Sequence, residues 1–193
     1  MKKIQAFTLA VLVASIALVA SQALAGSSVY FKSPVKARGT GCPGNNSMSV
    51  SGENTDTLTV LFDQFDAARP KNNAASGMMR TACSFAIPVH VPAGWQVSTM
   101  TADWRGYAEG KTKLHREYFF AGQRGPRADD SPKGDFSLRD NLMHTTWSKC
   151  GAGNVIIRIN SSVRAASSPS YIAVDTLDLK NKIIFHLKSR KCN

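Results

Sequence analysis

The four cysteines are the residues of this sequence with the most defined chemistry. They are Cys42, Cys83, Cys150 and Cys192. A structural zinc site needs ligands clustered as in C-x-x-C, whereas these cysteines are widely spaced, so we expect no metal site. An even number of cysteines in an exported chain is typical of disulfide bonds. Two bridges are therefore predicted, each stabilising the fold by about 2–4 kcal/mol, and all three possible pairings remain open.

Histidines and serines form no recognised catalytic or metal-binding string. The histidines are His90, His115, His144 and His186. None lies two or four residues from another, so the spacing of a metal motif is missing and we expect solvated imidazoles. The sequence also lacks G-x-S-x-G and H-E-x-x-H strings. We therefore predict a protein without catalytic residues, metal or cofactor, and a hydrolase whose site assembles only in space is the weaker alternative.

Three carboxylates lie close together in a segment rich in turn-forming residues. Asp129, Asp130 and Asp135 have the ligand type that calcium takes from flexible backbone segments. However, Arg127 and Lys133 lie among these acids and would repel a cation. We therefore expect a solvated loop of mixed charge and no calcium ion there.

Excess positive charge is the broadest chemical feature of the chain. Lysine and arginine number 24 against 13 acidic residues, for a formal net charge of +11. A first group of cations consists of Lys111, Lys113, Arg116, Arg124 and Arg127, and a second group consists of Lys180, Lys182, Lys188, Arg190 and Lys191. Such charge favours anionic partners such as cell-surface polymers, lipid headgroups or acidic proteins. No nucleic-acid-binding module is recognised, so nucleic acid is not an expected partner. Alternatively, the lysines serve solubility and block edge-to-edge strand pairing.

The tryptophans are a second candidate binding feature. Aromatic rings on an exposed β face can stack on sugar rings, although most aromatics of a small β protein lie in its core. Trp95 and Trp104 have opposite parity, so an unbroken strand over Trp95–Tyr107 would put them on opposite faces. At least one of the two is then expected to be partly exposed. We take Trp104 as a candidate binding residue together with the first group of cations.

The first 25 residues are typical of an export signal. Lys2 and Lys3 precede an apolar stretch, and Ala23 and Ala25 form an A-x-A cleavage site, so we place the cut after Ala25. An N-terminal membrane anchor is the less favoured interpretation. Removal of residues 1–25 takes away two lysines and no acid, which leaves a net charge of +9. No other long apolar run follows, so we expect no transmembrane segment in the mature chain and a secreted or periplasmic location.

Alternation of apolar and polar residues with a period of two runs through most of the mature chain and predicts half-buried strands. The clearest examples cover Thr57–Phe62, Ser84–Val91, Val155–Arg164 and Ile183–Lys188, and weaker ones cover Trp95–Tyr107, Leu114–Gly122, Phe136–Leu138 and Tyr171–Leu177. No mature segment carries a convincing helical stripe of apolar residues. Ala67–Ala82 is polar and is predicted as a long loop with room for one helical turn.

About eight to ten strands with one apolar face each need a second sheet to cover that face. We therefore predict an all-β protein, an antiparallel β-sandwich with long loops that is stapled by disulfides. A closed barrel is the alternative. The expected organisation is a signal peptide over 1–25, an extended lead-in over 26–38 and a single sandwich domain over 39–193.

Several short strings occur together along the chain. They are Gly39-Thr40-Gly41-Cys42-Pro43, Arg80 three residues before Cys83, Val91-Pro92-Ala93-Gly94-Trp95, Asp103-Trp104-Arg105-Gly106-Tyr107, Tyr118-Phe119-Phe120-Ala121-Gly122-Gln123, Trp147-Ser148-Lys149-Cys150-Gly151 and the closing Cys192. In this order they resemble the small secreted proteins of bacteria and fungi grouped as domain of unknown function 4360, over residues 39 to 192. The resemblance implies export, an all-β fold and paired cysteines, and it supplies no established catalytic residue or ligand. Trp104 and Lys149 depart from the family pattern, because a tyrosine and a proline are more usual there.

These observations predict an exported, non-catalytic binding protein whose ligand the sequence does not identify. The first hypothesis is an anionic or glycan surface engaged through basic loops, because the positive charge is high and catalytic strings are missing. The second hypothesis is a secreted inhibitor or effector that docks on another protein, because a small stapled scaffold with long loops suits that role.

Overall fold

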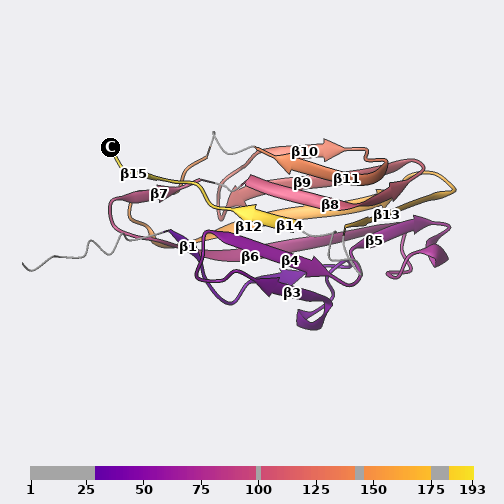
Figure 1. Cartoon of the computed structure of the whole chain (residues 1–193), viewed down its shortest axis with the longest axis horizontal. Coiled ribbons are helices and arrows are strands. Elements are labelled where there is room, and N and C mark those ends of the chain that lie inside the picture. Colours follow the sequence, from indigo (N-terminus) through magenta and orange to yellow (C-terminus); the bar gives the residue numbers. More distant parts are fainter. Residues whose placement is uncertain (1–28, 99–100, 142–145, 175–182) are drawn as a thin grey trace, which may run out of the picture.

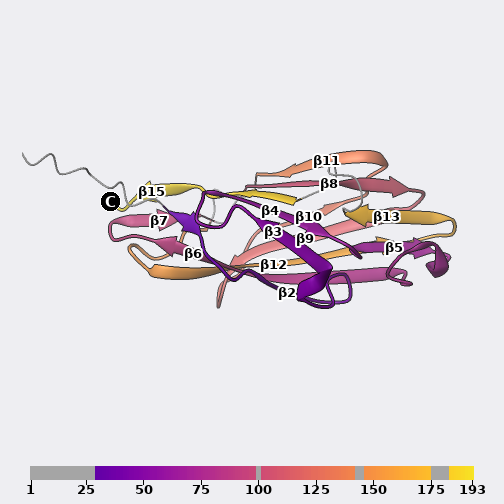
Figure 2. The same cartoon turned by 60° about the horizontal axis from the view of Figure 1, so that its bottom comes forward.

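Two antiparallel β-sheets packed against each other form the body of the protein (Figures 1 and 2). The computed structural model describes residues 29–98, 101–141, 146–174 and 183–193. The six-stranded sheet has the order β1-β6-β12-β9-β10, and β2 also pairs with β6. Its strands are β1 (Tyr30–Phe31), β2 (Lys36–Arg38), β6 (Arg80–Val91), β9 (Thr112–Phe120), β10 (Arg127–Asp130) and β12 (Gly153–Ala165).

The second sheet has seven strands in the order β3-β4-β14-β8-β13-β5, and β11 also pairs with β8. Its strands are β3 (Met48–Ser51), β4 (Thr57–Phe62), β5 (Asp66–Arg69), β8 (Thr101–Glu109), β11 (Gly134–Asp140), β13 (Ser170–Val174) and β14 (Ile183–His186). A separate two-stranded ribbon joins β7 (Trp95–Val97) to β15 (Ser189–Lys191). Two 3₁₀ turns, η1 (Asn45–Ser47) and η2 (Lys71–Asn73), complete the described elements. The predicted all-β antiparallel sandwich is confirmed.

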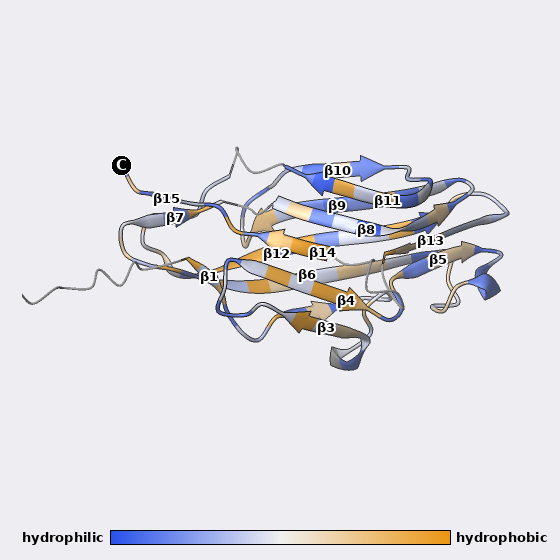
Figure 3. Cartoon of the chain, viewed as in Figure 1, coloured by the Kyte–Doolittle hydropathy of each residue, from blue (hydrophilic) through white to orange (hydrophobic). Residues whose placement is uncertain are grey.

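The core lies between the two large sheets and takes one face of each. On β6 the odd-numbered side chains from Thr81 to Val91 are buried, and they alternate with more exposed side chains. Phe85 of β6 meets rings from the facing sheet, with centroid distances of 5.6 Å to Phe62 and 6.4 Å to Phe185. Figure 3 shows the resulting alternation of hydrophobic and polar bands along β6 and β4. The same alternation turns the even-numbered side chains of β6 toward solvent.

The strong alternating segments of the sequence all form strands. β4 has the bounds predicted for it, and β6 and β12 extend beyond their predicted segments. β14 ends at His186, two residues before its predicted end. For the weaker segment Tyr171–Leu177, β13 covers the first part, and residues 175–177 lie outside the described residues.

The expectation of one strand over Trp95–Tyr107 is wrong. Residues Trp95–Val97 form β7 and pair with β15, whereas β8 begins at Thr101 and belongs to the seven-stranded sheet. The backbone N–H of Cys192 donates to the carbonyl of Gly94 at 2.8 Å, which holds the C-terminal segment along β7. Pairing with a segment distant in sequence therefore takes β7 out of the large sheet, and the parity argument for Trp95 and Trp104 no longer applies.

The prediction of a loop over Ala67–Ala82 is wrong at both ends of that segment. β5 begins at Asp66 and pairs with β13, and β6 already begins at Arg80. Between them, η2 provides the predicted helical turn. The Asp66 carboxylate accepts the backbone N–H groups of Ala75 and Ser76 at 2.6 and 2.9 Å, so a buried acid folds the connection back onto the strand.

Two disulfides resolve the pairing that the sequence left open. Cys42 pairs with Cys83 and Cys150 pairs with Cys192, with Cα–Cα distances of 5.6 and 5.9 Å. The first bridge fastens the segment after β2 to the middle of β6, and the second fastens the C-terminus to the loop before β12. The described part of the lead-in over 26–38 forms β1 and β2, which both pair with β6.

The predicted signal peptide over residues 1–25 lies outside the described residues. Across the described ranges, no helix is both long enough and apolar enough to span a bilayer.

The two disulfides close loops of nearly equal length, 41 and 42 residues apart in sequence, so the entropic part of their stabilisation is matched. We predict that C42S/C83S and C150S/C192S each lose about 2–4 kcal/mol of unfolding free energy. The loss is larger for C42S/C83S because both of its positions are fully buried and a serine there buries a hydroxyl group. Urea denaturation with linear extrapolation measures both values, and an equal or smaller loss for C42S/C83S would contradict this reasoning.

Candidate functional site

The outer face of the six-stranded sheet carries most of the charge that the strands present to solvent. Because side chains alternate along a strand, the residues between the core positions of β6, β9 and β12 point away from the second sheet. Cross-strand register then sorts these outward side chains into rows that run across the sheet. We call this surface the basic face. Its cations are Lys32, Lys36, Arg38, Arg80, Lys113, Arg127, Arg158 and Arg164, and its carboxylates are Glu117 and Asp129.

The rows of the basic face follow directly from the register. One row joins Lys36 of β2, Ala86 of β6 and Arg158 of β12. The next row joins Arg38 and Ser84 to Asn160, Glu117 and Arg127.

A further row of the basic face, Arg80–Arg164–Lys113, consists only of cations on three adjacent strands. The outward side chains in the middle of β6 are short, as at Ala82, Ser84 and Ala86. The longer cationic side chains of the basic face therefore extend farther from the sheet than this middle part does.

None of the eight cations of the basic face pairs with a carboxylate among the described residues. Lys32 instead donates to the side-chain oxygen of Asn154 at 3.1 Å, and Arg80 donates to the hydroxyl of Ser162 at 3.4 Å. Of the two carboxylates on this face, Asp129 lies 2.7 Å from Nδ1 of His115. The hydrogen bond with His115 lowers the pKa of Asp129. The eight cations of this face therefore form no ion pair with a described carboxylate, and among them the charge of Arg127 contributes to the lowered pKa of Asp129.

The predicted binding residues lie in three different places: on the basic face, in turns and in the core. Lys113 and Arg127 lie on the basic face. Lys111 lies in the turn between β8 and β9, and Arg124 lies in the turn between β9 and β10, where both side chains are exposed.

Arg116 and Trp104 are corrections, because their side chains are only 1% and 0% exposed and cannot contact an external ligand. On β9, Arg116 has the same parity as the buried residues Leu114, Tyr118 and Phe120, and this parity was visible in the sequence.

Arg116 belongs to a buried polar network between the sheets. Its Nε and Nη2 atoms donate to the two carboxylate oxygens of Asp140 at 2.8 and 2.6 Å, and Nη2 also reaches Asp130 at 2.6 Å. The Tyr118 hydroxyl donates to Asp140 at 2.5 Å and accepts from Nε1 of Trp104 at 2.6 Å. Every member therefore has a partner, as burial of charged and polar groups requires.

Burial and the charge of Asp140 together set the pKa values of Arg116 and Tyr118. Burial by itself would lower the pKa of Arg116, but the hydrogen bonds and charge of Asp140 outweigh burial and raise the pKa above its usual range. For Tyr118, burial and then the charge of Asp140 raise the pKa well above its ordinary value. At neutral pH the guanidinium is thus charged and the phenol is protonated. The network is a structural element on the core side of β9, and it faces away from the basic face.

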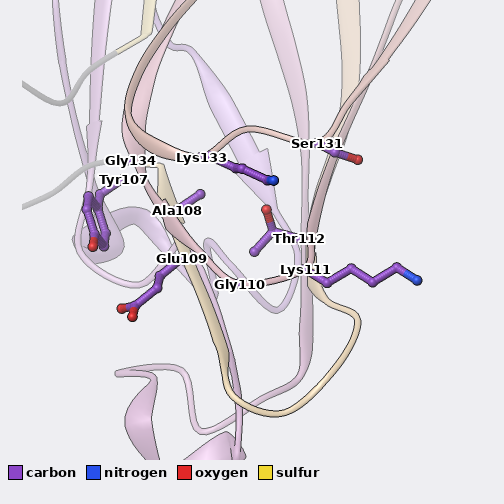
Figure 4. A pocket seen from close by; sticks show the side chains of 9 residues that line it. All are labelled: Tyr107, Ala108, Glu109, Gly110, Lys111, Thr112, Ser131, Lys133 and Gly134. Atoms are coloured by element: carbon purple, nitrogen blue, oxygen red, sulfur yellow. The ribbon is translucent and has the colours of Figure 1, made fainter.

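An open groove of about 540 Å³ lies where the β8–β9 turn approaches the β10–β11 turn (Figure 4). Its lining includes Tyr107, Glu109, Thr112 and Lys133. Figure 4 shows Lys133 and Thr112 directed toward the middle of the groove, whereas Lys111 extends away from it. Glu109 is the one carboxylate among the lining residues, so the groove does not present the paired carboxylates of a glycosidase.

The acids considered for calcium lie on strands and not in one loop. Asp129 and Asp130 belong to β10, and Asp135 belongs to β11, where they are held by strand pairing. The expectation that these residues form a solvated loop of mixed charge is therefore wrong. No group of three potential metal ligands is found among the described residues.

The described members of the second group, Lys188, Arg190 and Lys191, lie in or beside the β7–β15 ribbon. Figure 1 shows β7 and β15 together at one end and β5 and β13 at the other. In the ribbon, the Arg190 guanidinium lies 4.0 Å from the ring centroid of Trp147, and Lys188 and Lys191 are exposed. His144, Lys180 and Lys182 lie outside the described residues. Lys111 and Lys113 lie at the opposite end of β9 from Arg124, whose neighbour Gln123 lines a pocket with Lys149, so the described cations of the second group lie apart from Lys111 and Lys113 but not from Arg124.

The sequence reasoning missed the main part of the basic face. Arg158 and Arg164 stand at the polar positions of a strongly alternating segment, so their outward direction could be read directly. Their placement beside Arg80 and Lys113 could not be read, because it depends on the register of three strands that are far apart in sequence.

Comparison with known proteins places the chain in a family. A family model described as "Domain of unknown function (DUF4360)" matches residues 33–192, and the chain belongs to this family. An uncharacterized secreted protein of Arthroderma benhamiae is 32% identical over 170 residues, which cover 80% of this chain and 68% of that protein. The predicted family resemblance is thus confirmed.

Among solved structures, the similarities are distant. The structure of TmCBM61 in complex with beta-1,4-galactotriose aligns with a TM-score of 0.32 and 13% identity, covering 82% of this chain and 89% of that chain. The enzymatically active domain of tailspike protein 4 from bacteriophage CBA120 aligns with a TM-score of 0.24 and 12% identity, covering 86% and 19%. Similarities this distant carry no argument about function.

The buried network gives a stability prediction. D140N removes the buried carboxylate charge that accepts two hydrogen bonds from Arg116 and one from Tyr118, and it leaves only the partly exposed Asp130 as a carboxylate partner, which costs about 3–5 kcal/mol of unfolding free energy. Y118F removes one buried hydroxyl and costs about 1–3 kcal/mol. D135N on the exposed side of β11 is the matched control and changes stability by about 0.5 kcal/mol or less. Thermal and urea unfolding measure all three, and similar losses for D140N and D135N would refute the role assigned to the network.

Proposed function

We propose that this protein is exported and binds an anionic polymer on the basic face of its six-stranded sheet. The single observation that supports this most strongly is the unpaired charge, eight cations against two carboxylates on one side of one sheet. This proposal moves the expected contact from basic loops to a strand surface. Lys111 and Arg124 then lie in turns at the margins of that surface.

The size of the basic face suits a polymer better than a single small ion. Residues advance by about 3.4 Å along an antiparallel strand, so Arg158 and Arg164 are separated by about 20 Å. Neighbouring strands lie about 4.8 Å apart, so the row from Lys36 on β2 to Phe119 on β9 crosses three such spacings and is about 14 Å wide. Charges spread over such an area act together on a chain of repeated anionic groups.

Export is the second part of the proposal. It is supported by the leader over residues 1–25 with its A-x-A site, and by two disulfides, which persist in oxidising compartments. The fungal relative, whose name describes a secreted protein, is consistent with the same location.

The test compares equal losses of charge from two regions of the protein. R38Q/R127Q/R158Q removes three cations from the basic face, and R139Q/K188Q/K191Q removes three exposed cations from the other sheet and from the segment near the C-terminus. An exposed ion pair contributes about 0.2–1 kcal/mol, so the first variant should weaken binding to immobilised carboxymethyl dextran by about 3- to 100-fold. The second variant should bind within about twofold of the wild type, because its cations lie outside the contact surface.

Binding affinity is measured by biolayer interferometry over a series of salt concentrations. The affinity of the wild type should fall steeply as salt rises, because exposed charges are screened. Affinity that is insensitive to salt, or equal weakening by the two triple variants, would refute binding at the basic face.

A further inference from the structure

Three cations stand in direct register at one end of the basic face. Arg164 of β12 is paired with Arg80 of β6 on one side and with Lys113 of β9 on the other. Residues directly opposite each other in antiparallel strands have Cβ atoms about 4.5–5.5 Å apart, and like charges at such positions are destabilising. All three side chains are exposed, so nothing in the core requires a cation at any of these positions.

The surroundings of this row leave its charge uncompensated. The neighbouring row contains Ala82, Ser162 and His115, and its acid, Asp129, is engaged by His115 at 2.7 Å. No carboxylate among the described residues forms an ion pair with any of the three cations. The Arg80 Nη2 atom donates to Ser162 Oγ at 3.4 Å, so the guanidinium leans toward β12, which carries Arg164.

The chemistry of three adjacent cations selects among anions. A guanidinium presents a planar fork of N–H donors that matches two oxygens of an oxyanion, and a lysine ammonium acts as a compact point charge. A carboxylate has two oxygens in one plane and fits one such fork. A terminal sulfate or phosphate ester has three free oxygens around a tetrahedral centre, so it can face two guanidinium groups and an ammonium group together.

We propose that Arg80, Arg164 and Lys113 form a binding site for a terminal sulfate or phosphate ester group carried by the polymer that the basic face binds. This inference rests on the proposed function and makes it more specific, because it names the anionic group that the polymer carries. The remaining cations of the basic face contact the polymer through general electrostatic attraction, and the three-cation row provides selectivity for the ester group.

The experiment compares dextran sulfate with carboxymethyl dextran of the same chain length and charge density. The wild type should bind dextran sulfate at least about fivefold more tightly, because the ester group gains charge-assisted hydrogen bonds that a carboxylate cannot make. R80Q/R164Q should bind both polymers more weakly and bring the preference to within about twofold. R38Q/R158Q removes the same charge from the same face. It should weaken binding to both polymers while the preference for dextran sulfate remains.

Each pattern of results has a definite meaning. If both double variants bind both polymers more weakly and the wild type shows no preference for dextran sulfate, the ester site is overturned and the proposed function stands. A preference that survives in R80Q/R164Q would also overturn the ester site. If neither double variant weakens binding, the proposed function itself fails.

A second readout separates the polymer-bound group from a free ion. Sodium sulfate and sodium chloride at equal ionic strength are compared for their effect on Tm. Sulfate raises the Tm of folded proteins in general because it is excluded from their surfaces, so a Tm increase that is larger in the wild type and in R38Q/R158Q than in R80Q/R164Q supports a tetrahedral oxyanion site. Stabilisation of this kind without any preference for dextran sulfate would mean that the site takes only the free ion, which overturns the assignment to a polymer. Far-UV circular dichroism confirms that each variant is folded, and K113Q provides an independent variant of the same row.

Discussion

The pairing of β6 with β12 is the constraint on which the rest of the structure depends. These two long strands remain in antiparallel register from Val91–Gly153 to Arg80–Arg164 and form the centre of the six-stranded sheet. Because side chains alternate, one register decides both faces at once. It sends Phe85 and Ile159 into the core and sends Arg158 and Arg164 to solvent. A shift by one residue would bury the cations and expose the core, so folding and the proposed binding surface share one physical origin.

Two kinds of cation in this protein have opposite roles. Arg116 is enclosed between the sheets, where Asp140 and Asp130 compensate its charge and Tyr118 completes the network. Arg164 lies opposite Lys113, three residues before Arg116 on β9, and it has no carboxylate partner among the described residues. A surface cation without a carboxylate partner lowers the stability of the fold only slightly, because water and counterions solvate its charge. The same cation contributes binding free energy when a polyanion takes the place of those counterions. Net charge alone therefore does not distinguish Arg116 from the cations that we propose for binding, whereas the balance of charge around each cation does.

Local pattern predicted the sandwich because alternation at Ser84–Val91 and Val155–Arg164 requires a second sheet to cover the apolar face. It failed for β5 and β7, which are short, alternate weakly, and exist only because distant segments pair with them. The buried position of Arg116 could have been predicted from the parity of β9, but the abundance of nearby cations suggested a surface group. The disulfide pairing and the three-cation row depend on proximity in space, so no pattern within one segment determines them.

The most direct test of the central claim observes the arginine side chains one by one. Nε–Hε resonances in ¹⁵N-labelled protein are followed by NMR while a short dextran sulfate oligomer is added. If the basic face is the contact surface, the signals of Arg80, Arg158 and Arg164 shift and saturate together. The signals of Arg139, on the other sheet, and Arg190, in the β7–β15 ribbon, stay in place. Shifts centred on Arg139 or Arg190, with Arg80, Arg158 and Arg164 unchanged, would contradict the account.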